Sequence, residues 1–274
     1  MILAGLTGGS EEGYVMDFVR AANRAGHDCF VMTGRGLPEN TPCHSNATFH
    51  GARLTDCETV ARALRASLDA TGVKHSLFLV GFSMGALIVS NTVSKGGLGG
   101  TPAAGWRGGE GTCEAAAREP VIDGAVAIAG SLNPLTNTHY VFSAVFWQPL
   151  LSAILKNICS VTHGTYDRSV AVLTGVTEDT PPAERDEKQA AFDRLLHSEI
   201  DTVVDFDSLY LARYHGFKDV HHYYREMTSE VEDLGRCATP LLTLSACDDP
   251  ILHINSVANN IPEHFQSYHS FSDE

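Results

Sequence analysis

Several features that mark other protein classes are missing from this chain of 274 residues. It has no apolar run of about eighteen residues, so a conventional membrane-spanning helix is not expected. It has no basic cluster either, and its 19 basic residues are outnumbered by 33 acidic ones, for a formal charge of −14. Because a nucleic-acid backbone would be repelled by that charge, we expect no nucleic-acid partner.

The cysteines also lack any pairing pattern. They are odd in number, scattered and never in C-x-x-C, which argues against a disulfide framework and against structural zinc. No H-E-x-x-H or phosphate-binding glycine motif occurs, so no metal and no cofactor are predicted. The first residues show no charged segment followed by an apolar stretch, so we expect no signal peptide and a cytoplasmic, reducing location. Cys29 and Cys247 lie in apolar runs and are predicted to be core residues.

What is present is an alternation of short apolar runs with helical periodicity, which is typical of βαβ units. Because 43% of the residues are apolar, a full core is expected. We predict one α/β domain over 1–274, with a mostly parallel sheet and flanking helices. Strands are expected at Met1–Ala4, His27–Met32, Ser76–Val80, Val121–Ala129 and Leu241–Ala246, and helices at Glu11–Ala25, Leu54–Ala70 and from Ala86 onward.

Two stretches interrupt this alternation. Residues 95–120 are rich in glycine and are interpreted as a flexible surface insertion. The looser stretch at about 134–224 is interpreted as a lid over the sheet edge. Within it, the apolar segment Val141–Ile158 is either a lipid-facing lid or core, and core is favoured because buried apolar runs are commoner. Peripheral membrane contact therefore stays open, and the sequence gives no oligomeric state.

The most informative motif is Gly81-Phe82-Ser83-Met84-Gly85, which reads G-x-S-x-G between a strand-like run and an apolar helix start. That context is typical of a nucleophile elbow, in which a sharp turn presents the serine hydroxyl. In a chain with 25 glycines the motif could also arise by chance, and Gly81 and Gly85 would then be turn residues only. The correct flanks on both sides favour the elbow.

Further residues at the ends of predicted strands complete a catalytic arrangement. Ser83 would attack an acyl carbonyl with the help of a base, normally a histidine that an acid orients. The amides of Leu6 and Met84 would stabilise the oxyanion. Asp249 would be the acid, with Asp248 as runner-up, although either could instead be a helix cap or turn residue.

These residues resemble the α/β-hydrolase family that includes bacterial YheT-type hydrolases and animal abhydrolase-domain lipases. The resemblance implies a carboxylic-ester hydrolase that acts on lipids or short acyl esters, with Ser83 as nucleophile and Asp249 as acid. It is carried in the family's order by Gly5–Ser10, Arg35-Gly36, Gly81–Ala86, Tyr223-Tyr224-Arg225 with Ser229, and Pro240–Pro250.

Two departures from the family pattern matter. The loop's usual His-Gly is Ala4-Gly5 here, which is expected to loosen the oxyanion hole. The catalytic histidine, which follows a Gly-Gly pair in the family, is missing; His269 and His264 follow Asp249 but lack that context. The resemblance also implies strands upstream of the first one in this sequence, so the chain is expected to be truncated at both ends. Alternatives are an inactive hydrolase fold that serves as a binding or scaffold module, and an incomplete gene model whose uncovered sheet edge would favour aggregation.

Overall fold

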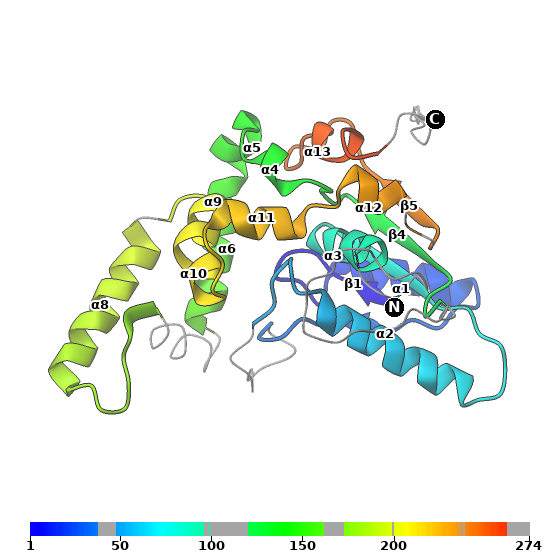
Figure 1. Cartoon of the computed structure of the whole chain (residues 1–274), viewed down its shortest axis with the longest axis horizontal. Coiled ribbons are helices and arrows are strands. Elements are labelled where there is room, and N and C mark those ends of the chain that lie inside the picture. Colours follow the sequence, from blue (N-terminus) through cyan, green and yellow to red (C-terminus); the bar gives the residue numbers. More distant parts are fainter. Residues whose placement is uncertain are drawn as a thin grey trace.

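The chain forms a parallel five-stranded sheet with helices on both faces, seen in a computed structural model (Figure 1). The structure describes residues 1–37, 48–95, 98, 120–161, 173–198, 200–235, 237 and 239–261. Nearly all of the expected glycine-rich insertion at 95–120 lies outside these residues. The strands are β1 (Ile2–Leu3), β2 (Val31–Met32), β3 (Phe78–Phe82), β4 (Gly124–Ile128) and β5 (Leu241–Leu244).

The strand order β2-β1-β3-β4-β5 makes β3 the centre of the sheet. Every pair is parallel, and β3 and β4 share the longest register, from Phe78 opposite Gly124 to Phe82 opposite Ile128. Parallel neighbours need a crossover, which is provided by helices α1 (Gly13–Arg24), α2 (Leu54–Asp69) and α3 (Met84–Ser94). The predicted α/β fold is confirmed.

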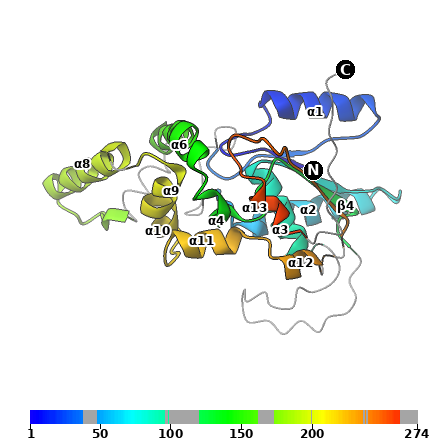
Figure 2. The ribbon, with the colours of Figure 1, turned by 90° about the horizontal axis from the view of Figure 1, so that it is seen from above.

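The side-chain alternation of the strands divides the core into two clusters. Ile2, Val80 and Val126 pack on the face that α1 covers, together with Val15 of that helix. Leu3, Leu79 and Ala125 point to the opposite face and pack with residues of α2 and α3. Figure 2 shows α1 on one side of the strands and α2, α3 and α12 (Val231–Gly235) on the other. Burial on both faces explains why the strands read as continuous apolar runs.

Four of the five predicted strands are longer than the observed ones, and the strand expected at Ser76–Val80 keeps its length but lies two residues later, at Phe78–Phe82. The expected strand at His27–Met32 contains only Val31–Met32, Val121–Ala129 contains Gly124–Ile128, and Leu241–Ala246 stops at Leu244. The apolar runs continue beyond the residues that pair with a neighbouring strand, so the sequence pattern overestimates the length of these strands.

A largely helical segment separates β4 from β5 and lies beside the sheet in Figure 1. It has an apolar cluster of its own, formed by Phe192, Ile200, Phe206 and Tyr210. The predicted lid at about 134–224 falls in this segment, and its role stays a prediction. The helices are α4 (Pro134–Asn137), α5 (Val141–Phe146), α6 (Gln148–Val161), α8 (Pro182–Ser198), α9 (Val203–Phe206), the π-helical turn η3 (Asp207–Leu211), α10 (Ala212–Tyr214) and α11 (Val220–Met227). The short α13 (Asn255–Ala258) follows β5.

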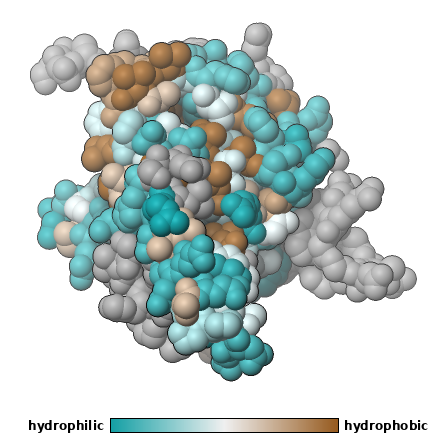
Figure 3. All heavy atoms as spheres, turned by 90° about the vertical axis from the view of Figure 1, so that its left-hand side faces the viewer, coloured by the Kyte–Doolittle hydropathy of each residue, from teal (hydrophilic) through white to brown (hydrophobic). Residues whose placement is uncertain are grey.

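The prediction that Val141–Ile158 is core is wrong for much of α5 and α6. Val141, Val145 and Phe146 are 72%, 61% and 65% exposed, and Leu150 and Ile154 are exposed as well. Hydrophobic side chains gather at the top of the face in Figure 3, the height at which α5 lies in Figure 1. The sequence shows that these residues are apolar but not that they project away from the sheet. Contact with a membrane stays a prediction.

Among the described residues, no helix is both long enough and apolar enough to cross a membrane.

The two cysteines that were predicted to be core residues differ in burial. Cys29 is half-buried and packs on the α1 side of the sheet, as predicted. Cys247 is exposed, so its prediction as a core residue is wrong, because β5 ends before it at Leu244.

Candidate active site

Ser83 lies at the sharp turn between the central strand β3 and helix α3. Its backbone has φ 51° and ψ −115°, a region that residues with a Cβ rarely occupy. The Ser83 N–H donates to the Ile128 carbonyl of β4 at 2.9 Å, and the Ser83 carbonyl accepts from Leu87 of α3 at 3.2 Å. The predicted strand and helix are thus present, and the turn between them is held from both sides.

Two glycines allow the strand and helix to approach this closely. A Cβ on Gly81 would lie 2.3 Å from the Gly85 carbonyl oxygen, and one on Gly85 would lie 2.4 Å from the Leu3 carbonyl oxygen. Both contacts are with backbone atoms, which cannot rotate away as a side chain can. Both positions of the motif therefore require glycine because a Cβ would prevent this packing. A residue that only formed a turn would not have this requirement.

Backbone strain is concentrated at this edge of the sheet. Among the described residues, the non-glycine positions with positive φ are Thr7, Ser83 and Ala129. Each follows the carboxyl end of a strand, β1, β3 and β4 respectively. Conformations of this kind cost about 1–3 kcal/mol each and persist where surrounding structure enforces them, often at functional sites.

The glycine-rich loop after β1 brings Leu6 to the same place. The Gly5 N–H donates to the Tyr14 hydroxyl at 2.8 Å, and Gly8 N–H donates to the Gly5 carbonyl at 3.1 Å. Tyr14 of α1 therefore supports a loop in which Ala4 replaces the expected histidine. Within the described part of the chain, neither the Leu6 nor the Met84 amide donates to another residue, so both remain free for a ligand.

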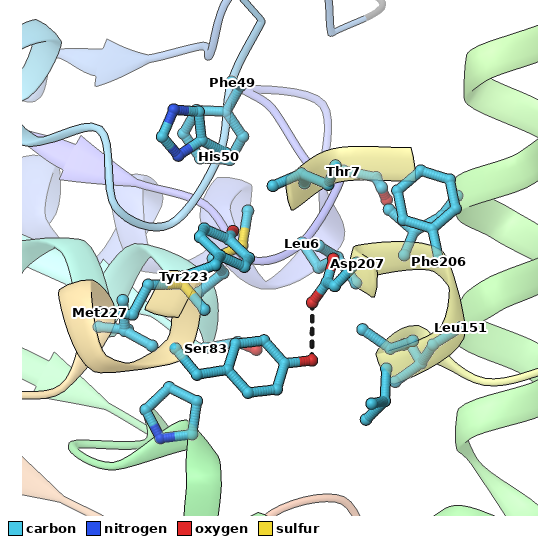
Figure 4. Close-up of a pocket in the computed structure, with 18 of the residues that line it drawn as sticks. Leu6, Thr7, Phe49, His50, Ser83, Leu151, Phe206, Asp207, Tyr223 and Met227 are labelled. Atoms are coloured by element: carbon cyan, nitrogen blue, oxygen red, sulfur yellow. Dashed lines mark hydrogen bonds between the residues drawn. The ribbon is translucent and has the colours of Figure 1, made fainter. Parts of the chain in front are cut away.

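Leu6, Ser83 and Met84 line one cavity of about 250 Å³. Figure 4 shows Leu6 and Ser83 together with residues from the helical segment, among them Leu151 and Phe206. Most of the lining is apolar, so the cavity suits an acyl or alkyl group. The structure thus brings together three of the four site residues that the sequence predicted.

Asp249 lies beyond β5 and is not among the lining residues. Its Oδ1 accepts from the amides of Ile251 and Leu252 at 2.8 and 2.9 Å, an arrangement that fixes a turn. Neither bond uses Oδ2. Ile251 and Leu252 line the cavity, so Asp249 holds the turn that reaches the pocket. These bonds support the alternative in which Asp249 is a turn residue, and its role as an acid stays a prediction. Asp248 is exposed.

No histidine among the described residues is hydrogen-bonded to Ser83 or Asp249. His253 Nδ1 accepts from Asn255 N–H, and His222 Nδ1 accepts from Lys218 N–H, so both act locally. His264 and His269 lie outside the described residues. No group of three or more metal-ligating side chains is present in the described part of the chain.

Sequence reasoning missed two titratable groups in the cavity wall, His50 and Asp207. His50 is 5% exposed, and its ring lies 4.3 Å from that of His215. Burial lowers the pKa of His50 to about 2 and that of His215 to about 4, helped by neighbouring positive charge. Burial raises the pKa of Asp207 to about 7, against one hydrogen bond from Tyr224. No motif marks these residues, since their chemistry depends on burial.

Comparison with known proteins gives relatives of low identity that cover most of the chain. An abhydrolase domain-containing protein of Dictyostelium discoideum is 25% identical over 248 residues, which are 90% of this chain and 52% of the relative. A monoacylglycerol lipase of Saccharomyces cerevisiae is 24% identical over 261 residues, 92% of this chain and 48% of the relative. A protein of Escherichia coli named putative esterase YheT is 23% identical over 258 residues, 92% of this chain and 61% of the relative.

These relatives agree with the resemblance that the sequence motifs indicated. The chain spans about half the length of the first two and 61% of the third. No family model matches the chain, and no solved structure matches it. Their names are those of an abhydrolase domain-containing protein, a lipase and a putative esterase, which supports a hydrolase at the level of the family.

Proposed function

We propose that this chain, which resembles α/β-hydrolases over most of its length, is a serine hydrolase that cleaves carboxylic esters at Ser83. The observation that carries the proposal is the shared cavity: the Ser83 side chain and the Leu6 and Met84 residues line one largely apolar space. A substrate carbonyl bound there would meet a hydroxyl and two free amides. The apolar wall favours an acyl chain, so lipid or short acyl esters are the proposed substrates.

The reaction would proceed by acyl transfer to the serine. Ser83 Oγ attacks the carbonyl carbon while a base takes its proton, and the oxyanion accepts hydrogen bonds from Leu6 N–H and Met84 N–H. Ser83 also lies at the N-terminus of α3, where the helix dipole favours negative charge. Collapse of the tetrahedral intermediate expels the alcohol, and water then releases the acid. A donor of this kind typically contributes about 3–4 kcal/mol to catalysis.

The base is proposed to be a histidine outside the described residues, oriented by Asp249. The bonds that fix the Asp249 turn use Oδ1 only, so Oδ2 is the oxygen that would accept from an imidazole N–H. Such a bond holds the imidazole in the tautomer that can take a proton from the serine.

A second function is favoured by the lack of a histidine bonded to Ser83 among the described residues: a hydrolase fold that binds ligands without cleaving them. A fluorophosphonate probe separates the two functions, because it reacts only with an activated serine. For the hydrolase we expect labelling of the chain, mapped to Ser83 by mass spectrometry, and its loss in Ser83→Ala.

Ser131→Ala is the matched control, because Ser131 lines the same cavity and is 5% exposed. This variant should keep the label. Unchanged labelling of Ser83→Ala would remove Ser83 as the nucleophile. A folded chain that takes no label but still binds an apolar ligand would instead support the binding protein.

A further inference from the structure

Asp207 is a buried carboxylic acid in the wall of the cavity that Ser83 lines. It begins the π-helical turn η3, is 7% exposed and follows Phe206 of α9. Its Oδ2 accepts from the Tyr224 hydroxyl of α11 at 2.8 Å, the bond drawn as a dashed line in Figure 4. π-Helical turns of this kind are rare and are found frequently at functional sites.

A purely structural role does not account for this carboxyl group. Asn91 shows how a buried structural side chain is satisfied here: its amide donates to the Leu87 and Met227 carbonyls, and its oxygen accepts from Ser229. Asp207 has four acceptor positions, and among the described residues only Tyr224 donates to it. Because buried polar groups are normally hydrogen-bonded, the remaining acceptor capacity at a cavity wall points to a ligand.

We propose that Asp207, held by Tyr224, selects ligands that carry a hydroxyl group into the cavity over ligands that are wholly apolar. The proposal rests on the proposed function in one respect, which is that such ligands are taken to be substrates. The hydroxyl would donate to the free oxygen of the carboxylate while the alkyl or acyl chain packs against apolar residues such as Leu151. Charge-assisted bonds of this type are stronger than neutral ones, more so in a dry cavity.

The selection should depend on pH because Asp207 changes charge near neutrality, with a pKa of about 7. Above that pH the carboxylate accepts from a hydroxyl. Below it the neutral acid tolerates an apolar neighbour, since burial penalises only the charged form. The hydroxylated ligand should therefore gain affinity relative to the apolar one as pH rises.

Four titratable side chains in the region of Asp207 do not change charge in the same pH range. His50 and His215 have pKa values of about 2 and 4, and the pKa values of Tyr223 and Tyr224 are well above their usual range. Among the described residues, charged groups on the neighbouring elements include Arg35 in the cavity wall, which is paired with Asp56; Asp205 of α9, which Thr202 binds; and Arg213 of α10, which is exposed.

The experiment compares two probes that differ only in their hydrogen-bond donors. One is an octyl glycerol ether with free hydroxyls, and the other is the same ether with its hydroxyls methylated. Isothermal titration calorimetry at about pH 5.5 and 8.5, either side of the Asp207 pKa, gives both affinities. We expect the affinity ratio of free to methylated ether to rise about tenfold or more between the two pH values.

Two variants show whether Asp207 causes the change. In Asp207→Asn, which keeps the shape but not the charge, the ratio should become independent of pH. In Tyr224→Phe, loss of the hydroxyl removes the donor that stabilises the carboxylate, so the midpoint should move to higher pH. Circular dichroism confirms that each variant is folded. The wild-type ratio tests the proposal even where a variant fails to fold.

Three outcomes would overturn the proposal: a wild-type ratio that does not change with pH, an unchanged profile in Asp207→Asn, or no binding of either probe. A structural role would weaken both probes equally and leave the ratio flat. The readout is independent of the proposed function because neither ether can be hydrolysed. A pH-dependent ratio without fluorophosphonate labelling would leave the binding site in place and remove the hydrolase.

Discussion

The nucleophile side and the acid side of the proposed machinery are built in different ways. Ser83 lies between the central strand β3 and helix α3, in which every residue from Gly85 to Ser94 is buried. Asp249 follows β5, the last strand of the sheet, where Leu242 and Leu244 are 53% and 48% exposed. One side is enclosed by backbone contacts, and the other is held by a local turn after the outermost strand of the described sheet.

The two turns therefore depend on different parts of the fold for their geometry. The Ser83 turn is fixed by contacts from β1, β4 and α3, so it is formed only when the core is formed. The Asp249 turn needs only the two amides that directly follow it. Changes at the nucleophile side should therefore affect the whole fold, whereas changes at the acid side should act locally.

The largest effect is expected for Gly85→Ala. The new Cβ would lie 2.4 Å from the Leu3 carbonyl oxygen and 2.5 Å from that of Ala4. Since β1 cannot move without leaving β3, we expect the free energy of unfolding to fall by about 3 kcal/mol or more. Urea unfolding followed by circular dichroism measures the loss.

Gly13→Ala is the matched control, because Gly13 begins α1 and a Cβ there would meet no atom within 4 Å. Alanine suits a helix better than glycine, so stability should stay level or rise by less than about 1 kcal/mol. A similar small effect for Gly85→Ala would mean that strand and helix are not as close as described.

The next effect concerns stability in acid and depends on His215, whose ring packs against His50 in the cavity wall. The pKa of His215 is lowered to about 4, first by burial and then by the charge of Arg53, against about 6.5 in the unfolded chain. Between those values the unfolded chain binds more protons, so stability falls as pH drops. His215→Gln should remove this contribution, about 3 kcal/mol across the full window, and make the decline between about pH 6.5 and 4 less steep. Buried His50 contributes to the decline in both proteins.

The slope of unfolding free energy against pH checks this expectation. Asp207 acts in the opposite direction, since its raised pKa makes stability fall as pH rises towards 7, but it is present in both proteins and cancels in the comparison. His221→Gln, at an exposed position, is the control and should leave the slope unchanged. An equal slope in His215→Gln would show that this histidine is not buried.

The sequence was informative where local pattern and structure coincide. The G-x-S-x-G motif placed Ser83 between a strand and a helix, and the apolar runs located all five strands. It was misleading for Val145 and Phe146, since hydrophobicity alone does not show which face of a helix has a neighbour. It gave no sign of Asp207, because a buried acid looks the same in sequence as an exposed one.

The smallest effect on stability is expected at Asp249, where a pair of variants separates the turn from the proposed acid. Asp249→Ala removes the acceptor of two amide hydrogen bonds and should reduce the free energy of unfolding by about 1 kcal/mol. Asp249→Asn keeps an oxygen at Oδ1 and should unfold like the wild type. If Asp249 orients a histidine, however, Asn should slow fluorophosphonate labelling of Ser83 by at least about a hundredfold, because it favours the wrong tautomer. Labelling of Asp249→Asn at the wild-type rate would mean that the turn is the whole role of Asp249, and the acid would have to be sought elsewhere.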